Sequence, residues 1–387
     1  MENNKQEITI PFNKPYLTGK ETEYIADAVK SGKISGNGIY TQKCQGFFEE
    51  KYGFKKFLLT TSCTDALEMC AILANIKVGD EVIVPSYTFV SSALAFVRQG
   101  ARIVFADSEA EHPNLDAQKL ETLITPKTKA IVPVHYAGMA CDMDAIMEVA
   151  EKYNLIVIED AAQGIDSYYT NKAGEKKALG TIGHLSAFSF HETKNIISGE
   201  GGGLGINDER FVERAEIIWE KGTNRSQFFR GEVNKYGWVD TGSSFLPSEI
   251  ISAFLWAQLE NLEDIQNKRK EIWNWYYEGL APIANKIDLP KIPAYATNNA
   301  HMFYLVCKDV EERSSLIQYL KESGVLSVFH YLSLHKSEFY ENYSQNRYQL
   351  PQSDKFQDCL VRLPFYYELS KNEVNRIVYL ILKHYEN

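Results

Sequence analysis

Leu155-Ile-Val-Ile-Glu-Asp160-Ala-Ala-Gln163 is the stretch that decides the fold of this 387-residue sequence. Its apolar half, residues 155–158, predicts a buried strand that ends on a carboxylate. A buried charge persists only when something opposite pairs with it, so Asp160 needs a cationic partner. Lys194 follows a second strand-like run, Leu185 to Phe190, where an amine can lose its water and react with an aldehyde. The two segments together predict a cofactor site.

A cofactor with a cationic ring nitrogen and an aldehyde matches this pair. Pyridoxal 5′-phosphate (PLP) has both groups, so Asp160 would face its pyridinium nitrogen and Lys194 would form the Schiff base. Gln163 lies close enough to Asp160 to hydrogen-bond the ring oxygen of the cofactor. Ser189 and His191 flank the approach to the lysine, and His191 is either a core residue or a cofactor or substrate contact. We therefore expect a PLP site built around Lys194.

Apolar runs alternate with helix-like segments along the first 255 residues. The runs are Lys56–Thr60, Glu81–Val84, Arg102–Phe105, Ala130–Val134 and Leu155–Ile158. Five such units in a row predict an α/β fold, with a mainly parallel sheet covered by helices on both faces. The expected architecture is therefore a three-layer α/β/α domain.

The length of the chain predicts two domains, because single cores stop growing beyond about 250 to 300 residues. We expect a large cofactor-binding domain over residues 15–255 and a smaller α+β domain over residues 256–387. A long polar and aromatic helix pattern, Ala257 to Tyr277, would link them. The C-terminal domain would contain a strand over Met302–Val306 and helices over Glu311–Glu322 and Lys371–His384.

Composition excludes several classes of protein. The 41 basic and 51 acidic residues give a formal charge of −10 without a basic run, which argues against a nucleic-acid surface. No segment has the length and apolarity of a membrane span or a secretion signal, so a cytoplasmic protein is expected. The six cysteines form no C-x-x-C pair, which favours reduced thiols over disulfides or a metal site.

Two further motifs sit where strands end and helices begin. Thr60 to Leu67 contains Ser62, Thr64 and Asp65, and the start of a helix there offers backbone N–H groups to a phosphate. The alternative is an ordinary helix cap, and Asp65 would have to turn its carboxylate away from a phosphate. Phe89 follows the second strand and could stack on the cofactor ring, although a single apolar aromatic is more often core.

These motifs, in this order, resemble the DegT-type nucleotide-sugar aminotransferases, PLP enzymes of fold type I. The segments that carry the resemblance are Ser62–Leu67, Pro85–Phe89, Pro133–Gly138, Glu159–Gln163 and Phe188–Asn195. The resemblance covers essentially the whole chain. It implies a homodimer with active sites at the subunit interface, in which PLP alternates with its pyridoxamine form.

The resemblance also implies a role for each matching residue. Lys194 and Asp160 would be catalytic, and the cofactor would be held by Thr64, Asp65, Phe89, Asp160, Gln163, Ser189 and Lys194. One contact in the family comes from the partner subunit, through an asparagine in a Gly-aromatic-Asn-aromatic-Arg motif. This chain has Gly242-Ser-Ser244-Phe-Leu246 instead, so the shorter Ser244 stands at that position and would bind through water or not at all.

Within the family, the segments 221–231, 240–245, 301–304 and 328–335 resemble enzymes that aminate C4 of dTDP-4-keto-6-deoxy-D-glucose, with L-glutamate as donor. Candidate substrate residues are His191, Lys221, Asn224, Arg225, Gln227, Arg230, His330 and Tyr331. Their cations could neutralise a diphosphate, whereas the plain alternative is a solvated loop.

Three other functions stay open on the sequence. The ketone could lie at C3, or the nucleotide could be UDP. A related PLP sugar dehydratase carries histidine in place of the lysine, which Lys194 argues against. A regulator without catalysis would be expected to have lost Lys194 or Asp160 and to carry a DNA-binding domain.

Overall fold

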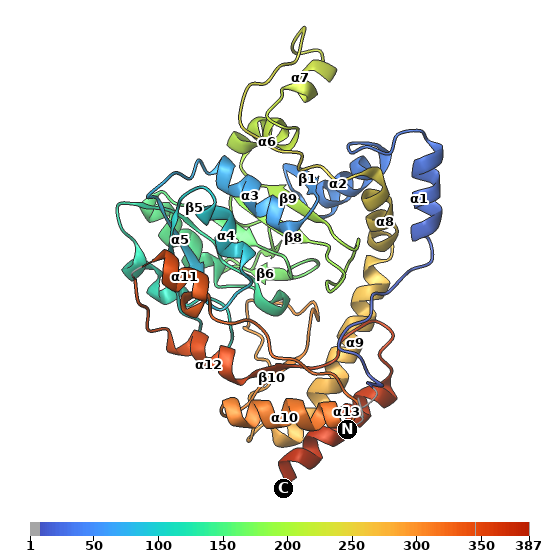
Figure 1. Cartoon of the computed structure of the whole chain (residues 1–387), viewed down its shortest axis with the longest axis vertical. Helices are drawn as coiled ribbons and strands as arrows, with labels where there is room; N and C mark the ends of the chain where they lie inside the picture. The colour runs from blue at the N-terminus through green and yellow to red at the C-terminus, as the bar shows by residue number, and fades with distance from the viewer. Residues whose placement is uncertain (1–7, 345, 387) are drawn as a thin grey trace, which may run out of the picture.

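A seven-stranded sheet forms the centre of the computed structural model, which describes residues 8–344 and 346–386 (Figure 1). The strand order is β1-β9-β8-β5-β4-β2-β3, and only β9 runs antiparallel to its neighbours. The strands are β1 (Lys56–Thr60), β2 (Glu81–Pro85), β3 (Arg102–Ala106), β4 (Thr128–Ile131), β5 (Ile156–Asp160), β8 (Leu185–Ser189) and β9 (Gly202–Ile206). The predicted mainly parallel sheet is thereby confirmed.

Helices cover both faces of this sheet, as the alternation of side chains along a strand requires. Ile158 of β5 packs in one core with α3 and α4, whereas its neighbour Val157 packs in another with α5. The helices of this part are α1 (Glu21–Lys30), α2 (Ile39–Tyr52), α3 (Cys63–Leu73), α4 (Ser91–Val97), α5 (Met143–Tyr153), α6 (Val212–Trp219) and α7 (Arg225–Phe229). The three-layer prediction is confirmed.

The C-terminal region has its own core around the small antiparallel sheet of β10 (Tyr304–Val306) and β11 (Leu360–Arg362). Its helices are α9 (Leu262–Leu280), α10 (Val310–Glu322), α11 (Glu338–Tyr343), α12 (Pro351–Cys359) and α13 (Lys371–Glu386). Tyr340 of α11 returns to the large sheet and packs against Phe105 of β3, with ring centroids 4.7 Å apart. The predicted C-terminal strand and helices are present.

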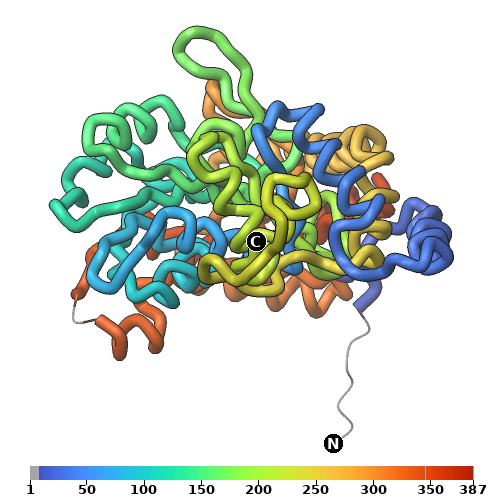
Figure 2. Tube along the Cα trace, turned by 90° about the horizontal axis from the view of Figure 1, so that it is seen from above, coloured from blue at the N-terminus to red at the C-terminus, as the bar shows by residue number. Residues whose placement is uncertain are grey.

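The long helix expected from Ala257 is in fact two helices. Two residues, Glu260 and Asn261, separate α8 (Glu249–Leu259) from α9. Asn261 has φ −108° and ψ 15°, and its side-chain amide donates to the carbonyl of Ala257 at 2.9 Å. An asparagine that bonds to nearby backbone competes with the helix, so the prediction of one continuous helix is wrong. From above, α1 (blue) lies at the edge of the molecule beside the yellow segment with α8 (Figure 2).

The remaining elements are short. A hairpin of β6 (Tyr168–Thr170) and β7 (Lys176–Ala178) follows β5. The 3-10 helices are η1 (Ala117–Leu123), η2 (Tyr136–Gly138), η3 (Glu209–Phe211), η4 (Ala281–Ile283) and η5 (Leu334–Lys336). Across the described part of the chain, no helix is both long and apolar enough to cross a bilayer.

Candidate active site

The ends of several strands meet at one edge of the sheet, because parallel neighbours point their carboxyl ends the same way. β5 ends at Asp160 and β8, its parallel neighbour, ends at Ser189. Lys194 lies on the turn that follows β8, where its N–H donates to the carbonyl of His191 at 2.9 Å. The fold therefore brings Lys194 and Asp160, the central pair of the sequence analysis, to the same edge.

Lys194 is an amine that has lost much of its hydration. Desolvation lowers the pKa of Lys194, and the positive charge of Arg362 lowers it further, against the opposing influence of Cys63 and Asp160. A lowered pKa increases the fraction of neutral amine near neutral pH. Lys194 is thus suited to react with an aldehyde and to accept a proton.

Asp160 is buried with only part of its charge matched. Its carboxylate accepts bonds from Ser92 Oγ at 2.7 Å and from the Ala162 N–H at 3.1 Å. Burial nevertheless raises the pKa of Asp160, although these bonds and the nearby Lys194 act the other way. A cation beside this carboxylate would therefore be stabilised. Ser92 comes from α4, 68 positions before Asp160, and nothing in the sequence around it indicates this contact.

The start of α3 has the features of an anion site. Ser62 is the N-cap and accepts the N–H of Asp65 at 3.1 Å, while Thr64 Oγ1 lies 2.7 Å from Ser91 Oγ. Asp65 turns its carboxylate towards Thr61 and Ser62. The Asp65 carboxylate thus faces its own loop, an arrangement that is compatible with an anion at the start of α3.

A glycine allows the neighbouring strand to pass close to this helix. An added Cβ on Gly202 of β9 would lie 2.3 Å from the backbone carbon of Ser62. Any larger residue would push β9 away from the start of α3. The Gly-rich stretch beyond Lys194 therefore allows the close backbone approach at this point.

Tyr331 contacts both Phe89 and Gln163, which come from separate segments of the chain. Phe89 is 56% exposed although it follows a buried strand, and its ring centroid lies 6.1 Å from that of Tyr331. The Gln163 amide accepts the N–H of Ala137 at 2.6 Å and donates to the hydroxyl of Tyr331 at 3.1 Å. An exposed phenylalanine inside a site is a surface that a flat ring can cover.

The C-terminal region reaches this site through His330 and Tyr331, whose rings stack 3.5 Å apart. His330 Nδ1 is 2.6 Å from the hydroxyl of Tyr136, and burial lowers the pKa of His330 well below its usual value. A neutral imidazole can exchange hydrogen bonds with sugar hydroxyls. His191 lies three residues before Lys194, with its Nδ1 2.9 Å from Thr193 Oγ1, and Ser189 Oγ accepts the N–H of His191 at 3.4 Å.

The remaining candidate substrate residues lie apart from this group, on a projecting segment of residues 220–243 that we call the arm. Figure 1 shows the arm, with α7, at the opposite end of the molecule from α10 and α13. Arg230 pairs with Glu216 and Glu232, both at 2.7 Å, whereas Arg225 is 3.8 Å from Glu220. The fold of one chain does not bring Lys221, Asn224, Arg225, Gln227 and Arg230 to Lys194.

Ser244 lies just after the arm and near the start of α3. Ser244 is exposed, and its backbone forms an isolated antiparallel β-bridge with Glu220. The next residue, Phe245, is buried, and its carbonyl accepts the N–H of Thr61 at 2.9 Å. Ser244, which departs from the family motif, therefore directly precedes a residue whose backbone is hydrogen-bonded to Thr61, in the loop before α3.

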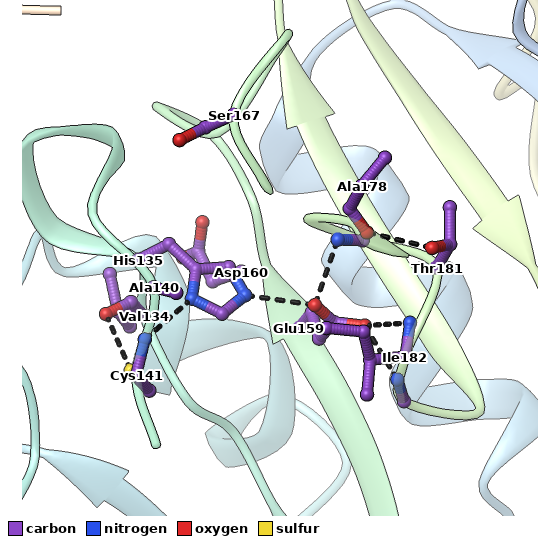
Figure 3. A network of polar contacts seen from close by, with 12 residues as sticks. Val134, His135, Ala140, Cys141, Glu159, Asp160, Ser167, Ala178, Thr181 and Ile182 are labelled. Carbon is purple, nitrogen blue, oxygen red and sulfur yellow. Dashed lines mark hydrogen bonds and ion pairs between the residues drawn. The ribbon is translucent and has the colours of Figure 1, made fainter. Parts of the chain in front are cut away.

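A buried network of polar contacts lies behind Asp160 (Figure 3), and the sequence pattern did not predict it. Glu159 points to the opposite face of the sheet from Asp160, where its carboxylate is 2.9 Å from His135 Nε2. It also accepts backbone N–H groups of Gly180, Ile182 and Gly183 at 2.5 to 2.8 Å. Since His135 Nδ1 accepts the N–H of Cys141, Nε2 carries the proton. Glu159 is thus fully satisfied by its own chain.

Comparison with known proteins agrees with this geometry. The model of the DegT/DnrJ/EryC1/StrS aminotransferase family matches residues 15–382. The spore coat polysaccharide biosynthesis protein SpsC of Bacillus subtilis is 30% identical over 385 residues, with 97% of this chain and 96% of SpsC covered. The GDP-perosamine synthase of Caulobacter vibrioides is 33% identical over 323 residues, which cover 82% of this chain and 83% of the synthase.

A solved structure identifies the cofactor. The structure of the sugar aminotransferase Spr1654 from Streptococcus pneumoniae in its PMP (pyridoxamine phosphate) form superposes on this chain with a TM-score of 0.90. The two chains are 26% identical, and the match covers 97% of this chain and 99% of Spr1654. A PLP form of the same protein superposes with a TM-score of 0.88. This chain has a desolvated lysine, a partly matched buried carboxylate and a helix start at one sheet edge, and all three fit that group. Pyridoxal 5′-phosphate is therefore its cofactor.

Proposed function

This chain belongs to the DegT/DnrJ/EryC1/StrS aminotransferase family, and from that premise we propose which amino group it moves and where. The donor is L-glutamate and the acceptor is C4 of dTDP-4-keto-6-deoxy-D-glucose. The products are 2-oxoglutarate and dTDP-4-amino-4,6-dideoxy-D-galactose. The observation that carries the transamination is the desolvated Lys194 beside the buried Asp160.

The choice of sugar rests on the sequence of the segments around the site. Residues 221–231, 240–245, 301–304 and 328–335 resemble the enzymes that make this 4-amino sugar for enterobacterial common antigen. One relative is named for polysaccharide biosynthesis and another for a GDP-linked sugar. A surface polysaccharide precursor is therefore the proposed product, and a different nucleotide is the alternative.

In this proposal, Lys194 carries the proton in both halves of the reaction. Its neutral amine takes a proton from Cα of the amino acid and later delivers a proton to C4 of the sugar. The face from which Lys194 delivers this proton sets the configuration of the new amine. When bound, PLP supplies the electron sink that stabilises negative charge on the reacting carbon.

The other residues bind and orient the cofactor. Asp160 holds the ring nitrogen in its protonated form, since that positive charge offsets the cost of burying the carboxylate. Thr64, the backbone of Asp65 and Ser189 hold the phosphate, Phe89 stacks on the ring, and Gln163 contacts the ring oxygen. His191, His330 and Tyr331 line the side where the sugar enters.

We also propose a homodimer in which the arm serves the active site of the partner. Arm residues Phe229 and Trp238 are 69% and 85% exposed, and such large apolar surfaces indicate an interface. The arm's cations would then meet the diphosphate of a sugar bound to the other subunit. Ser244, which is shorter than the family's asparagine, would reach the phosphate bound to the other subunit through water or not at all.

The proposal is tested by following the visible absorbance band of the bound cofactor. L-glutamate should bleach this band, and dTDP-4-keto-6-deoxy-D-glucose should restore it, with the amino sugar identified by NMR. The UDP and GDP counterparts and a 3-keto sugar serve as matched acceptors. Faster recovery with one of these would reject the proposed sugar but keep the transaminase, whereas no bleaching by L-glutamate would reject the donor.

A further inference from the structure

His301, which lies three residues before β10, is held by hydrogen bonds on several sides. Its backbone N–H donates to Asn299 Oδ1 at 3.1 Å, and its carbonyl accepts a bond from Arg269 Nη2 at 2.6 Å. Its ring Nδ1 is 2.8 Å from Asn195 Oδ1, and the residue is only 6% exposed. Asn195 directly follows Lys194 in the sequence. The ring of His301 is therefore fixed against the turn that carries Lys194.

The backbone directly before His301 is strained. Ala300 is fully buried and has φ 51°, in the left-handed region that a residue with a Cβ seldom adopts. Its N–H donates to Asn298 Oδ1 at 2.8 Å, and its carbonyl accepts a bond from Arg269 Nε at 3.0 Å. Strain of this kind persists only where the surrounding structure enforces it, and it is concentrated at functional sites. The position of His301 is thus maintained at a cost in free energy.

The hydrogen bonds of Asn195 determine which ring nitrogen of His301 carries the proton. Asn195 Nδ2 donates to Gln266 Oε1 at 2.7 Å and to the carbonyl of Asn299 at 2.9 Å. The amide oxygen of Asn195 is therefore the atom that faces His301, and an amide oxygen only accepts hydrogen bonds. Nδ1 of His301 thus carries the proton, and Nε2 is left as an acceptor. Among the described residues, none donates a hydrogen bond to this Nε2.

His301 is an uncharged acceptor in a cationic environment. Burial lowers the pKa of His301 well below its usual value, and the positive charges of Lys194, Arg269 and Arg362 lower it further. The ring therefore stays neutral at neutral pH, with a lone pair on Nε2. Such a lone pair would repel an anion, such as a substrate carboxylate, and it matches an N–H donor. The amine of Lys194 is a donor of this kind, on the residue next to Asn195.

We propose that His301 is a positioning residue, whose Nε2 accepts a hydrogen bond from the amine of Lys194 whenever that amine is free of the cofactor. The assignment rests on the proposed function, in which Lys194 carries the proton, and it adds how the amine is aimed. A lysine side chain is a flexible four-carbon stem, so an amine without an anchor spends much of its time away from the reacting carbon. Holding the amine in reach of that carbon is the role of His301.

A neutral imidazole suits this role better than a carboxylate would. A neutral amine can donate one N–H to Nε2 and keep its own lone pair for the proton of the substrate. After it has taken that proton, the ammonium can keep the same hydrogen bond. A carboxylate at this position would instead raise the pKa of Lys194 and trap it as an ammonium. An uncharged acceptor therefore orients Lys194 in both of its protonation states.

Two substitutions separate the functions of the two ring nitrogens. The amide of asparagine reaches as far as Nδ1, so His301→Asn keeps a donor towards Asn195 and loses the acceptor towards Lys194. The longer glutamine places an amide oxygen near the lost Nε2 but breaks the bond to Asn195. Proton removal from Cα of L-glutamate should slow by about 100-fold in His301→Asn and by less in His301→Gln, with the affinity for glutamate unchanged. A purely structural role through Nδ1 would give the opposite order and overturn the proposal.

Deuterium at Cα of glutamate identifies the affected step. Because proton transfer becomes slower in His301→Asn, the deuterium isotope effect on the single-turnover rate should rise above that of the wild type. The matched control is His335→Asn. His335 is also buried, with Nδ1 2.7 Å from Ser86 Oγ and Nε2 without a hydrogen-bond partner in the described structure. The control should keep the wild-type isotope effect even if it is less stable, and an equal rise in both variants would overturn the proposal.

The cofactor-free protein gives a readout without turnover. The rate at which acetic anhydride acetylates Lys194, followed by mass spectrometry across pH, reports the pKa of its amine. A hydrogen bond to Nε2 is stronger from the ammonium than from the neutral amine, so its loss in His301→Asn should lower the pKa of Lys194. Cys63, Asp160 and Arg362, which also act on Lys194, are unchanged in this variant. An identical labelling profile in variant and wild type would overturn the proposal.

Nitrogen NMR of the histidines in the wild type needs no substitution and covers the case of a variant that does not fold. The Nε2 resonance of His301 should shift when an amino acid frees Lys194 from the cofactor, and a constant resonance would overturn the proposal. Any L-amino acid that bleaches the cofactor band can replace L-glutamate, so a wrong donor does not affect the result. Full turnover by Lys194→Ala would reject the proposed proton carrier, whereas the labelling profile would still show whether His301 holds the amine.

Discussion

The sheet edge around Lys194 and the arm handle charge in opposite ways. At the sheet edge, Lys194 and Asp160 are desolvated and incompletely matched, which changes the pKa of each. On the arm, Arg230 is exposed and bound to two glutamates. Buried charges without full partners cost free energy, whereas exposed pairs contribute little. The difference indicates that the sheet edge is built to be completed by a ligand and that the arm is stable without one.

Lys194→Ala tests the sheet edge most severely. Turnover should fall by about 10⁴-fold or more, because no other described group is placed to carry the proton between Cα and the sugar. The variant should still fold and bind pyridoxamine phosphate, as measured by circular dichroism and cofactor fluorescence. Turnover close to the wild-type rate would show that Lys194 is not the catalytic lysine.

Asp160→Asn separates function from stability. Turnover should fall by about 100-fold, since the ring nitrogen loses the charge that keeps it protonated. Between the usual pKa of an aspartate and the raised pKa of Asp160, the native protein binds more protons than the unfolded chain. The stability of the cofactor-free wild type therefore falls as pH rises through this window, whereas the asparagine variant has no such dependence.

The measurement is the melting temperature of both cofactor-free proteins from acidic to neutral pH. The asparagine variant should gain on the wild type as pH rises, although it is the poorer enzyme. A variant that is both fully active and equally stable at every pH would show that the unmatched charge of Asp160 has no role.

Glu159→Gln examines a buried charge that is fully matched. The glutamine amide would face the N–H groups of His135 and Gly180, so two donors would lose their acceptor. The free energy of unfolding should fall by about 3 kcal/mol. Urea denaturation would measure this, with Glu209→Gln as the control, because Glu209 forms only a 3.6 Å surface pair with Lys55 and should change stability by less than about 0.5 kcal/mol. Equal effects of the two changes would contradict the interpretation.

The sequence predicted the sheet edge well because its signals are local. A strand that ends in Glu159-Asp160 and a lysine just after another strand are short motifs, and parallel topology places their ends together. The predicted strand over Lys56–Thr60 has the same bounds in the structure, where its short apolar run, Phe57 to Leu59, is buried. β4, predicted to reach Val134, ends as a regular strand at Ile131. Pro133 has no N–H to donate, and the pairing resumes as an isolated bridge between Val134 and Asp160.

Contacts between distant parts of the chain could not be predicted in this way. Ser92 is hydrogen-bonded to Asp160, and Tyr331 is hydrogen-bonded to Gln163, 168 positions away. Nothing in the local sequence of these segments indicates which residue the other contacts. On the arm, the sequence indicated the arginines but not their ion pairs. The glutamates that pair with Arg225 and Arg230 are spread over residues 216–232, so no short motif shows which glutamate meets which arginine.

The smallest expected effect belongs to the arm, and it distinguishes its two arginines. Arg225 is only loosely paired, at 3.8 Å from Glu220, so it is available to a diphosphate at little cost. Arg230 must first leave Glu216 and Glu232, which also hold the pKa of Arg230 above its usual range. Arg225→Ala should therefore raise the KM for the nucleotide sugar by about 10-fold, and Arg230→Ala by less, while the reaction with L-glutamate stays unchanged in both. A larger effect for Arg230→Ala would mean that its glutamates position it for the substrate, and a loss of the glutamate reaction would mean that the arm supports the sheet edge itself.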